Sequence, residues 1–131
     1  MNKSLQKIQI VEQLLQKSVT GKAIRIPFAQ DIMLARMHVA GTNYYEAKKV
    51  AEKLSPGQRF GLRREPENVH DEFAIEVLTT QGHKLGYIPR RYNEIPARLM
   101  DAGKRLFVQM ESLKKRGEWL EIRLSLYMED Y

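Results

Sequence analysis

The 131-residue sequence contains no cysteine. This absence excludes disulfide bridges, thiolate metal sites and cysteine nucleophiles, and it fits a reducing cytoplasm, which is the location we expect. The sequence also lacks any apolar run near the ~18 residues that span a bilayer, so we expect no membrane partner. Polar residues interrupt the apolar ones throughout the first 17 residues, unlike the continuous apolar stretch of a secretory signal peptide.

The residues of common catalytic sites are scarce as well. The three histidines, at positions 38, 70 and 83, have no metal-ligand spacing, and no serine lies in a nucleophile elbow. The phosphate-binding pattern GxxxxGK[ST] is missing. His70 and Asp71 are adjacent, and adjacent residues of a strand point to opposite faces. We therefore predict that the protein is not an enzyme and that it needs no metal or other cofactor.

Positive charge, in contrast, is in excess. Lysine and arginine number 22 against 16 aspartates and glutamates, which gives a formal net charge of +6. A small basic domain is suited to nucleic acid or another anionic surface, although solubility alone also explains a modest excess. The length is that of one domain with a single hydrophobic core.

The first 30 residues are predicted to form an N-terminal helical extension. Apolar residues recur at the three-and-four spacing of one helical face between positions 4 and 17, and Gly21 ends the pattern. We expect this apolar stripe to pack on the domain itself or on a second copy.

Residues 31–131 are predicted to form the domain proper. Alternating apolar residues indicate about six short strands, at 32–40, 58–63, 73–77, 83–88, 106–110 and 120–126. Residues 114–117 are predicted to form a basic loop. The strands follow one another too closely for βαβ crossovers, so the pattern favours a mainly β fold, a small and partly closed antiparallel barrel.

Two short helices are predicted between the strands. The first covers residues 47–54, where apolar residues share one face. The second covers residues 94–102, with Asn93 as its N-cap and Pro96 in its first turn. Ile95, Leu99 and Ala102 are expected to face the core.

Three groups of residues are candidates for binding. Tyr44 and Tyr45 are neighbours and cannot both face one core, so at least one is expected on the surface, where it can stack on a base. The alternative is one core tyrosine and one amphipathic surface tyrosine. The polar turn at 64–71 contains Asn68 and Asp71, which can cap their own turn or bind a sugar hydroxyl. Arginines 90 and 91 follow Tyr87 at a strand end, where they suit a phosphate or simply solvent.

Taken together, these groups resemble the signature of the HIRAN domain family. The resemblance rests on Gly41-Thr42-x-Tyr44-Tyr45, Arg64-Glu65-Pro66-x-Asn68-x-x-Asp71-x-x-Ala74-Ile75 and Gly86-Tyr87-Ile88-Pro89-Arg90, and it covers about residues 34–126. The family occurs at the N-terminus of eukaryotic fork-remodelling ATPases and as small stand-alone bacterial proteins. The resemblance implies an OB-like barrel that binds single-stranded DNA at a free 3′ hydroxyl end.

The resemblance also implies roles for the candidate residues. Tyr44 would stack on a base, Tyr45 would line the pocket, and Asp71 would accept a hydrogen bond from the 3′ hydroxyl, with Asn68 beside it. Tyr87 and Arg90 match positions that reach the DNA backbone. Two positions depart from the pattern: His70 lies where DNA-binding members have a tyrosine, and Asn43 lies where they have an arginine.

The sequence therefore predicts a binding module for single-stranded DNA with a free 3′ end, acting in DNA repair or replication-fork processing. Its expected sites are Tyr44, Tyr45, Asn68, His70, Asp71, Tyr87, Arg90 and Arg91. A helicase, a nuclease or another repair protein is the expected protein partner. The alternative is a protein-interaction module without a nucleotide pocket, in which the N-terminal helix recruits the partner.

Overall fold

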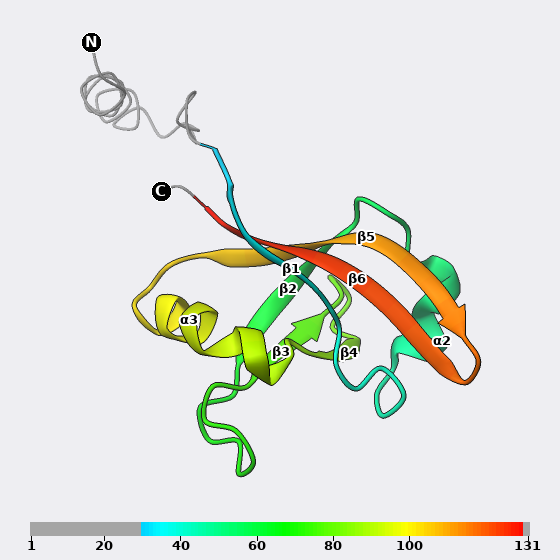
Figure 1. Ribbon diagram of the computed structural model, residues 1–131, viewed down its shortest axis with the longest axis horizontal. Coiled ribbons are helices and arrows are strands. Elements are labelled where there is room, and N and C mark those ends of the chain that lie inside the picture. The colour runs from blue at the N-terminus through cyan, green and yellow to red at the C-terminus, as the bar shows by residue number, and fades with distance from the viewer. Residues whose placement is uncertain (1–29, 130–131) are drawn as a thin grey trace. The chain divides into compact units, whose positions relative to one another are not determined.

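The computed structural model describes residues 30–129, so the helix predicted at 4–17 lies outside the described residues. Six antiparallel strands form one sheet in the order β1-β6-β5-β2-β3-β4 (Figure 1). The strands are β1 (Ile32–His38), β2 (Arg59–Arg64), β3 (Ile75–Leu78), β4 (Lys84–Tyr87), β5 (Leu106–Arg116) and β6 (Trp119–Met128). The helices are α2 (Ala47–Val50), the 3₁₀ turn η1 (Ala51–Lys53) and α3 (Arg90–Asp101).

The sheet curls into an OB-like half-barrel, as the sequence predicts. More buried and more exposed residues alternate along β2, whereas most residues of β6 are buried. Two β-bulges bend the strands that flank β6, one between Met33 and Ala35 and one between Met110 and Ser112. Bulges increase the local twist of a strand, which is why a sheet of long strands can curl here rather than stay flat. None of the helices in residues 30–129 is long and apolar enough to cross a membrane.

A single pair of residues brings the two edges of the sheet together. Ala40, just after β1, exchanges backbone hydrogen bonds of 2.8 and 2.9 Å with Tyr87 at the end of β4. Gly86 makes this approach possible, because a Cβ atom there would lie 2.2 Å from the Ala40 carbonyl oxygen. The loop that follows β1 is thereby held against the end of β4.

The core fills the inside of the half-barrel. Thr42 is buried with it, and its hydroxyl donates a 2.7 Å hydrogen bond to the Leu120 carbonyl, which ties the loop after β1 to β6. All six strands and two of the helices contribute apolar side chains to the core. Its largest fully buried apolar members are Phe60, Ile75, Leu85, Ile88, Met110, Ile122, Leu124 and Leu126.

The second predicted helix differs from the observed α3 in its start and its inward face. The helix begins at Arg90, directly after Pro89, and Asn93 is a buried residue of the helix rather than its N-cap. Pro96 therefore lies in the second turn. The buried residues are Asn93, Pro96 and Ala97. Of the residues predicted to face the core, Ile95 is 69% exposed, Ala102 is also exposed and Leu99 is half-buried. The prediction was wrong because it took the polar Asn93 as a helix start, when Asn93 is used inside the domain.

The basic loop predicted at 114–117 is also different in the structure. Residues 114–116 belong to β5, and only Gly117 and Glu118 form the turn to β6. Gly117 has a φ of 62°, the left-handed conformation that two-residue hairpin turns favour. The hairpin is consequently long, and its tip lies beside α2 (Figure 1).

Candidate nucleic-acid interface

A pocket of about 260 Å³ opens between the loop after β1, the β2–β3 turn, the end of β4 and the start of α3. Seven of the eight residues predicted as a site line it together: Tyr44, Tyr45, Asn68, His70, Asp71, Tyr87 and Arg90. Arg91 does not line the pocket, and its guanidinium lies over the Tyr92 ring, 4.8 Å from the centroid. The fold thus gathers residues that are more than 40 positions apart in the sequence.

The two neighbouring tyrosines both lie at the surface. Tyr44 is 84% exposed, and its amide donates a 3.0 Å hydrogen bond to the Gly41 carbonyl, so a tight turn fixes its backbone. Tyr45 is 38% exposed, and its ring packs edge-on against Tyr87 with centroids 5.6 Å apart. The alternative in which one of them is a core residue is wrong, because the core contains neither.

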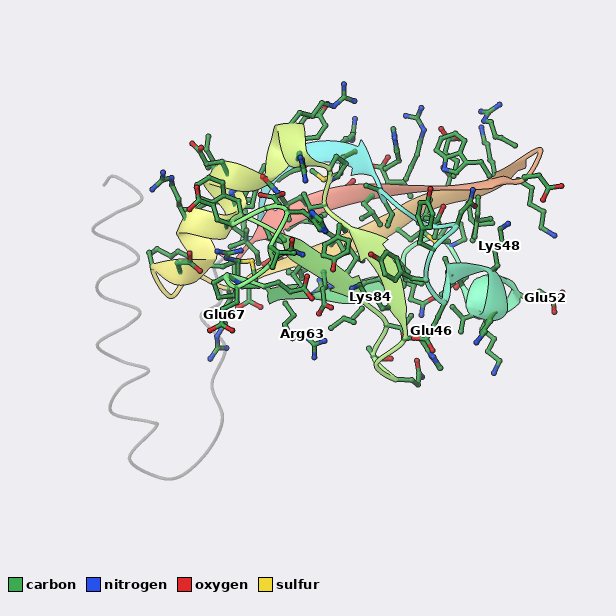
Figure 2. The ribbon with its side chains drawn as sticks, turned by 90° about the horizontal axis from the view of Figure 1, so that it is seen from below. Glu46, Lys48, Glu52, Arg63, Glu67 and Lys84 are labelled. Atoms are coloured by element: carbon green, nitrogen blue, oxygen red, sulfur yellow. The ribbon has the colours of Figure 1, made fainter. Side chains whose placement is uncertain are left out.

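Lys84 on β4 holds the aromatic wall of the pocket in place. Its ammonium lies 4.2 Å from the centroid of the Tyr45 ring and 4.3 Å from that of Tyr87, a cation–π arrangement with both. The same Nζ donates a 2.6 Å hydrogen bond to the Tyr87 hydroxyl and lies 3.2 Å from Glu76 Oε1. In Figure 2, Lys84 lies between Arg63 and Glu46. Lys84 is therefore a structural cation of the pocket wall.

The Tyr87 hydroxyl in turn donates a hydrogen bond to the carboxylate of Glu65. It lies 2.6 Å from Glu65 Oε1, and burial together with this carboxylate raises the pKa of Tyr87 to about 12. Burial opposes the charge on Glu65, but hydrogen bonds from Tyr87 and Asn68, together with the Lys84 ammonium, outweigh it and lower the pKa of Glu65. At neutral pH the pair consists of a neutral phenol and an ionised carboxylate.

The polar turn caps itself through both of its predicted site residues. Asn68 Oδ1 accepts hydrogen bonds from the amides of His70 and Asp71, at 2.9 and 3.1 Å. Asp71 Oδ1 accepts one from the Phe73 amide at 2.9 Å, and Asp71 Oδ2 accepts one from Asn93 Nδ2 at 2.7 Å. Asn68 and Asp71 therefore cap the backbone of their own turn, which is one of the two roles that the sequence left open. A carboxylate offers about four acceptor positions, so the Asp71 side chain keeps capacity for a further donor.

Arg90 supplies the positive charge at the rim of the pocket. Its NH2 group donates a 2.9 Å hydrogen bond to the His70 carbonyl, and its Nε lies 3.7 Å from Asp71 Oδ2. The Arg90 side chain is 71% exposed, whereas that of Asp71 is 18% exposed. The pocket thus has an exposed cation above a mostly buried carboxylate.

Sequence reasoning missed two residues that shape the site. Asn93 was assigned to a helix cap, and Lys84 was not among the predicted site residues, yet they hold Asp71 and the tyrosine rings. Both act across 20 or more positions in the chain on at least one partner. No local sequence pattern carries a signal for contacts between residues this far apart. The burial of Asn93 inside α3 is seen only in the structure.

Comparison with known proteins agrees with this geometry. A family model described as the HIRAN domain matches residues 32–129. A crystal structure of a protein from Lactobacillus plantarum is 32% identical with a TM-score of 0.71, over 79% of this chain and 99% of that chain. The crystal structure of the HIRAN domain of human HLTF has the same fold, with 20% identity and a TM-score of 0.60, over 76% of this chain and 79% of that chain.

One curated relative is similar in sequence over a shorter stretch. It is a putative SWI/SNF-related matrix-associated actin-dependent regulator of chromatin, subfamily A member 3-like 1, from Arabidopsis thaliana. The identity is 32% over 65 residues, which is half of this chain and only 7% of that protein. Because the HIRAN match spans nearly all of the described residues, the chain belongs to the HIRAN domain family, a family of non-catalytic nucleic-acid-binding domains.

Proposed function

We propose that the pocket receives the 3′-terminal nucleotide of single-stranded DNA. Tyr44 stacks on the terminal base, and Tyr45 and Tyr87 form the wall behind it. Arg90 meets the adjoining phosphate, and Asp71 accepts a hydrogen bond from the free 3′ hydroxyl. The pocket volume of about 260 Å³ lies just below the range of about 300–1,000 Å³ that is typical of small-molecule sites, so the pocket suits one nucleotide rather than several.

The observation that carries this proposal is the fixed carboxylate of Asp71 in a pocket of a basic protein. Two hydrogen bonds hold its oxygens in place, and the side chain is mostly buried. An ionised carboxylate only accepts hydrogen bonds, so it attracts a hydroxyl and repels a phosphate. A carboxylate is therefore unfavourable inside a site for internal phosphates and favourable at a strand end that terminates in a hydroxyl.

Exposed aromatic surface supports a single strand rather than a duplex. The Tyr44 ring is available to solvent, and base stacking on an aromatic contributes about 1–3 kcal/mol per base. Duplex bases are already stacked and hide their faces. His70 at the rim presents an imidazole in place of the second phenol, and Arg91 adds charge beside the pocket rather than inside it.

We place this binding in DNA repair or replication-fork processing, with a helicase, a nuclease or another repair protein acting on the captured end. Membership of the HIRAN family and the similarity to a chromatin-regulator relative support this assignment. A protein-interaction module without a nucleotide pocket is the alternative, and it predicts no preference among DNA ends.

Fluorescence anisotropy with labelled oligonucleotides tests the proposal. A strand with a free 3′ hydroxyl should bind at least about tenfold more tightly than the same strand with a 3′ phosphate, a difference of about 1.4 kcal/mol. Asp71→Ala should remove most of this preference, whereas Glu72→Ala, an exposed carboxylate next to it, should keep it. Melting temperatures of both variants separate loss of binding from loss of fold. Equal affinity of the wild-type protein for the two ends would refute the proposal.

A further inference from the structure

A second and larger hollow, of about 610 Å³, is lined by residues of α2 and η1, which follow the pocket residues Tyr44 and Tyr45 in the sequence. It separates α2 and η1 from the tip of the β5–β6 hairpin. Its lysines come from both walls, Lys48 and Lys49 from α2 and Lys115 from β5. Trp119, the single tryptophan of the sequence, begins β6 and lines the same hollow. We call this hollow the lysine groove.

The lysine groove has a small excess of positive charge. Lys48, Lys49 and Lys115 are all exposed, and none of their ammonium groups lies within 4 Å of a carboxylate of residues 30–129. Two acidic residues, Glu52 and Glu118, also line the groove and leave three cations against two anions. Figure 2 shows Lys48 and Glu52 on the same helical segment. An anionic ligand is therefore the favoured occupant.

Trp119 gives the lysine groove an aromatic face at a fixed position. Its ring packs edge-on against His38 with centroids 5.6 Å apart, and the side chain is still partly exposed. A held aromatic ring among lysines is the combination that single-stranded nucleic acid uses, since bases stack on the ring and phosphates meet the ammonium groups.

The lysine groove and the nucleotide pocket are close along the chain. Lys48 follows Tyr45 by three residues, across the bend that leads into α2. Successive phosphates of a stacked strand are about 3.4 Å apart along its axis, and the four residues of α2 span about 6 Å, so about two nucleotides match the length of this helix. Thr42, which is buried against Leu120, ties the loop that bears the tyrosines to the first residues of β6. Both sites are therefore lined by one continuous segment of the chain, residues 40–52.

We propose, on the basis of the proposed function, that the strand held by its 3′ end continues in the 5′ direction over α2 into the lysine groove. Lys48, Lys49 and Lys115 contact its phosphates, and a base more than one nucleotide from the end stacks on Trp119. The protein then binds a longer strand through two base-stacking sites, one at the end and one inside the strand.

Trp119 fluorescence measures occupancy of the lysine groove directly, because the chain has no other tryptophan. The probes are oligothymidylates with a free 3′ hydroxyl, one a dinucleotide and one of about 12 nucleotides, within the 4–16 nucleotides that single OB folds cover. The dinucleotide should bind in the pocket and leave the emission unchanged. The longer strand should bind more tightly and quench the emission.

Charge variants give an independent readout. Replacing Lys48, Lys49 and Lys115 together by glutamine should reduce the slope of log affinity against log salt for the longer strand by about 2, since each lost phosphate contact removes about 0.7. The dinucleotide affinity should stay as it is. Lys104→Gln is the control, because Lys104 is exposed in the loop between α3 and β5. This loop lies at the opposite end of the β5–β6 hairpin from its tip (Figure 1).

The outcomes separate this inference from the proposed function. If the dinucleotide shows end preference but the longer strand neither binds more tightly nor quenches Trp119, the lysine groove is not part of the DNA path and the pocket proposal stands. The same result is expected if the groove instead binds a protein. If neither oligonucleotide shows end preference, the proposed function itself is wrong.

Discussion

Asn93 on α3 and Asp71 on the β2–β3 turn are joined by a 2.7 Å hydrogen bond from Asn93 Nδ2 to Asp71 Oδ2. Asn93 is 3% exposed, so the amide cannot turn away to water. The bond occupies one face of the carboxylate and fixes the direction of the other. Helix α3 thereby orients the carboxylate of Asp71 on the polar turn.

Replacing this amide should cost both stability and end preference. Asn93→Ala removes the amide that donates a hydrogen bond to Asp71 Oδ2. Leaving a buried acceptor without its donor lowers the free energy of unfolding by about 1–3 kcal/mol. We expect the free energy of unfolding in urea to fall by that amount. The preference for a 3′ hydroxyl over a 3′ phosphate should fall as well, because the carboxylate gains freedom to rotate. A variant as stable and as selective as the wild type would contradict the positioning role.

Tyr44 should matter for binding but not for folding. Because the Tyr44 side chain is 84% exposed, Tyr44→Ala should leave the melting temperature unchanged. It should weaken the binding of single-stranded DNA by about 1–3 kcal/mol. Tyr44→Phe keeps the ring and should retain most of the affinity. Ile95→Ala, which truncates another exposed side chain, on α3, is the control and should have no effect. If Tyr44→Ala destabilises the protein or leaves affinity unchanged, Tyr44 does not stack on a base.

The fold was accessible from the sequence because its signal is local. Alternating apolar residues such as Leu120, Ile122, Leu124 and Leu126 face one side of a strand, and all four are buried in β6. The start of α3 was not accessible, since Asn93 has the side chain of an N-cap and only the tertiary structure shows that it is used elsewhere. Local propensity and tertiary use conflict at this residue.

The sequence predicted most residues of the candidate site but not the contacts that orient their side chains. Spacing and resemblance selected Tyr44, Asn68 and Asp71, and the fold brings these residues to one pocket. Asp71 is oriented by a hydrogen bond from Asn93, and the rings of Tyr45 and Tyr87 are held by Lys84, and these partners lie far apart in the sequence. A pattern of residue types carries no information on such pairings, because register and barrel closure decide them.

Closure of the half-barrel should depend on Gly86. Gly86→Ala would place a Cβ atom 2.2 Å from the Ala40 carbonyl oxygen, and a backbone atom cannot yield as a flexible side chain does. Overpacking costs about 1–3 kcal/mol, and we expect at least that loss in urea unfolding. The bridge between Ala40 and Tyr87 should open, so DNA affinity should also fall. Gly82→Ala is the control, since nothing lies within 4 Å of its Cβ, and only the smaller cost of its positive φ is expected.

The hydrogen bond between Tyr87 and Glu65 should be visible in the alkaline titration of the protein. Burial, with the Glu65 carboxylate as acceptor, raises the pKa of Tyr87 to about 12 from an ordinary value near 10. The folded protein therefore holds the phenolic proton more firmly than the unfolded chain. The resulting stabilisation is complete below pH 10 and is lost as the pH rises from about 10 to about 12.

Ultraviolet absorbance of tyrosinate measures this titration, and subtracting the curve of Tyr87→Phe isolates the one residue. Glu65→Gln keeps an acceptor for the hydroxyl but removes the negative charge, so the pKa of Tyr87 should move down towards 10. Lys84 acts in the opposite direction, because its ammonium favours the phenolate, and Lys84→Met should move the pKa up. Opposite shifts in these two variants are expected only if both groups contact the phenol. A Tyr87 that titrates near 10 in the wild-type protein would exclude the hydrogen bond to Glu65 and, with it, the fixed aromatic wall of the pocket.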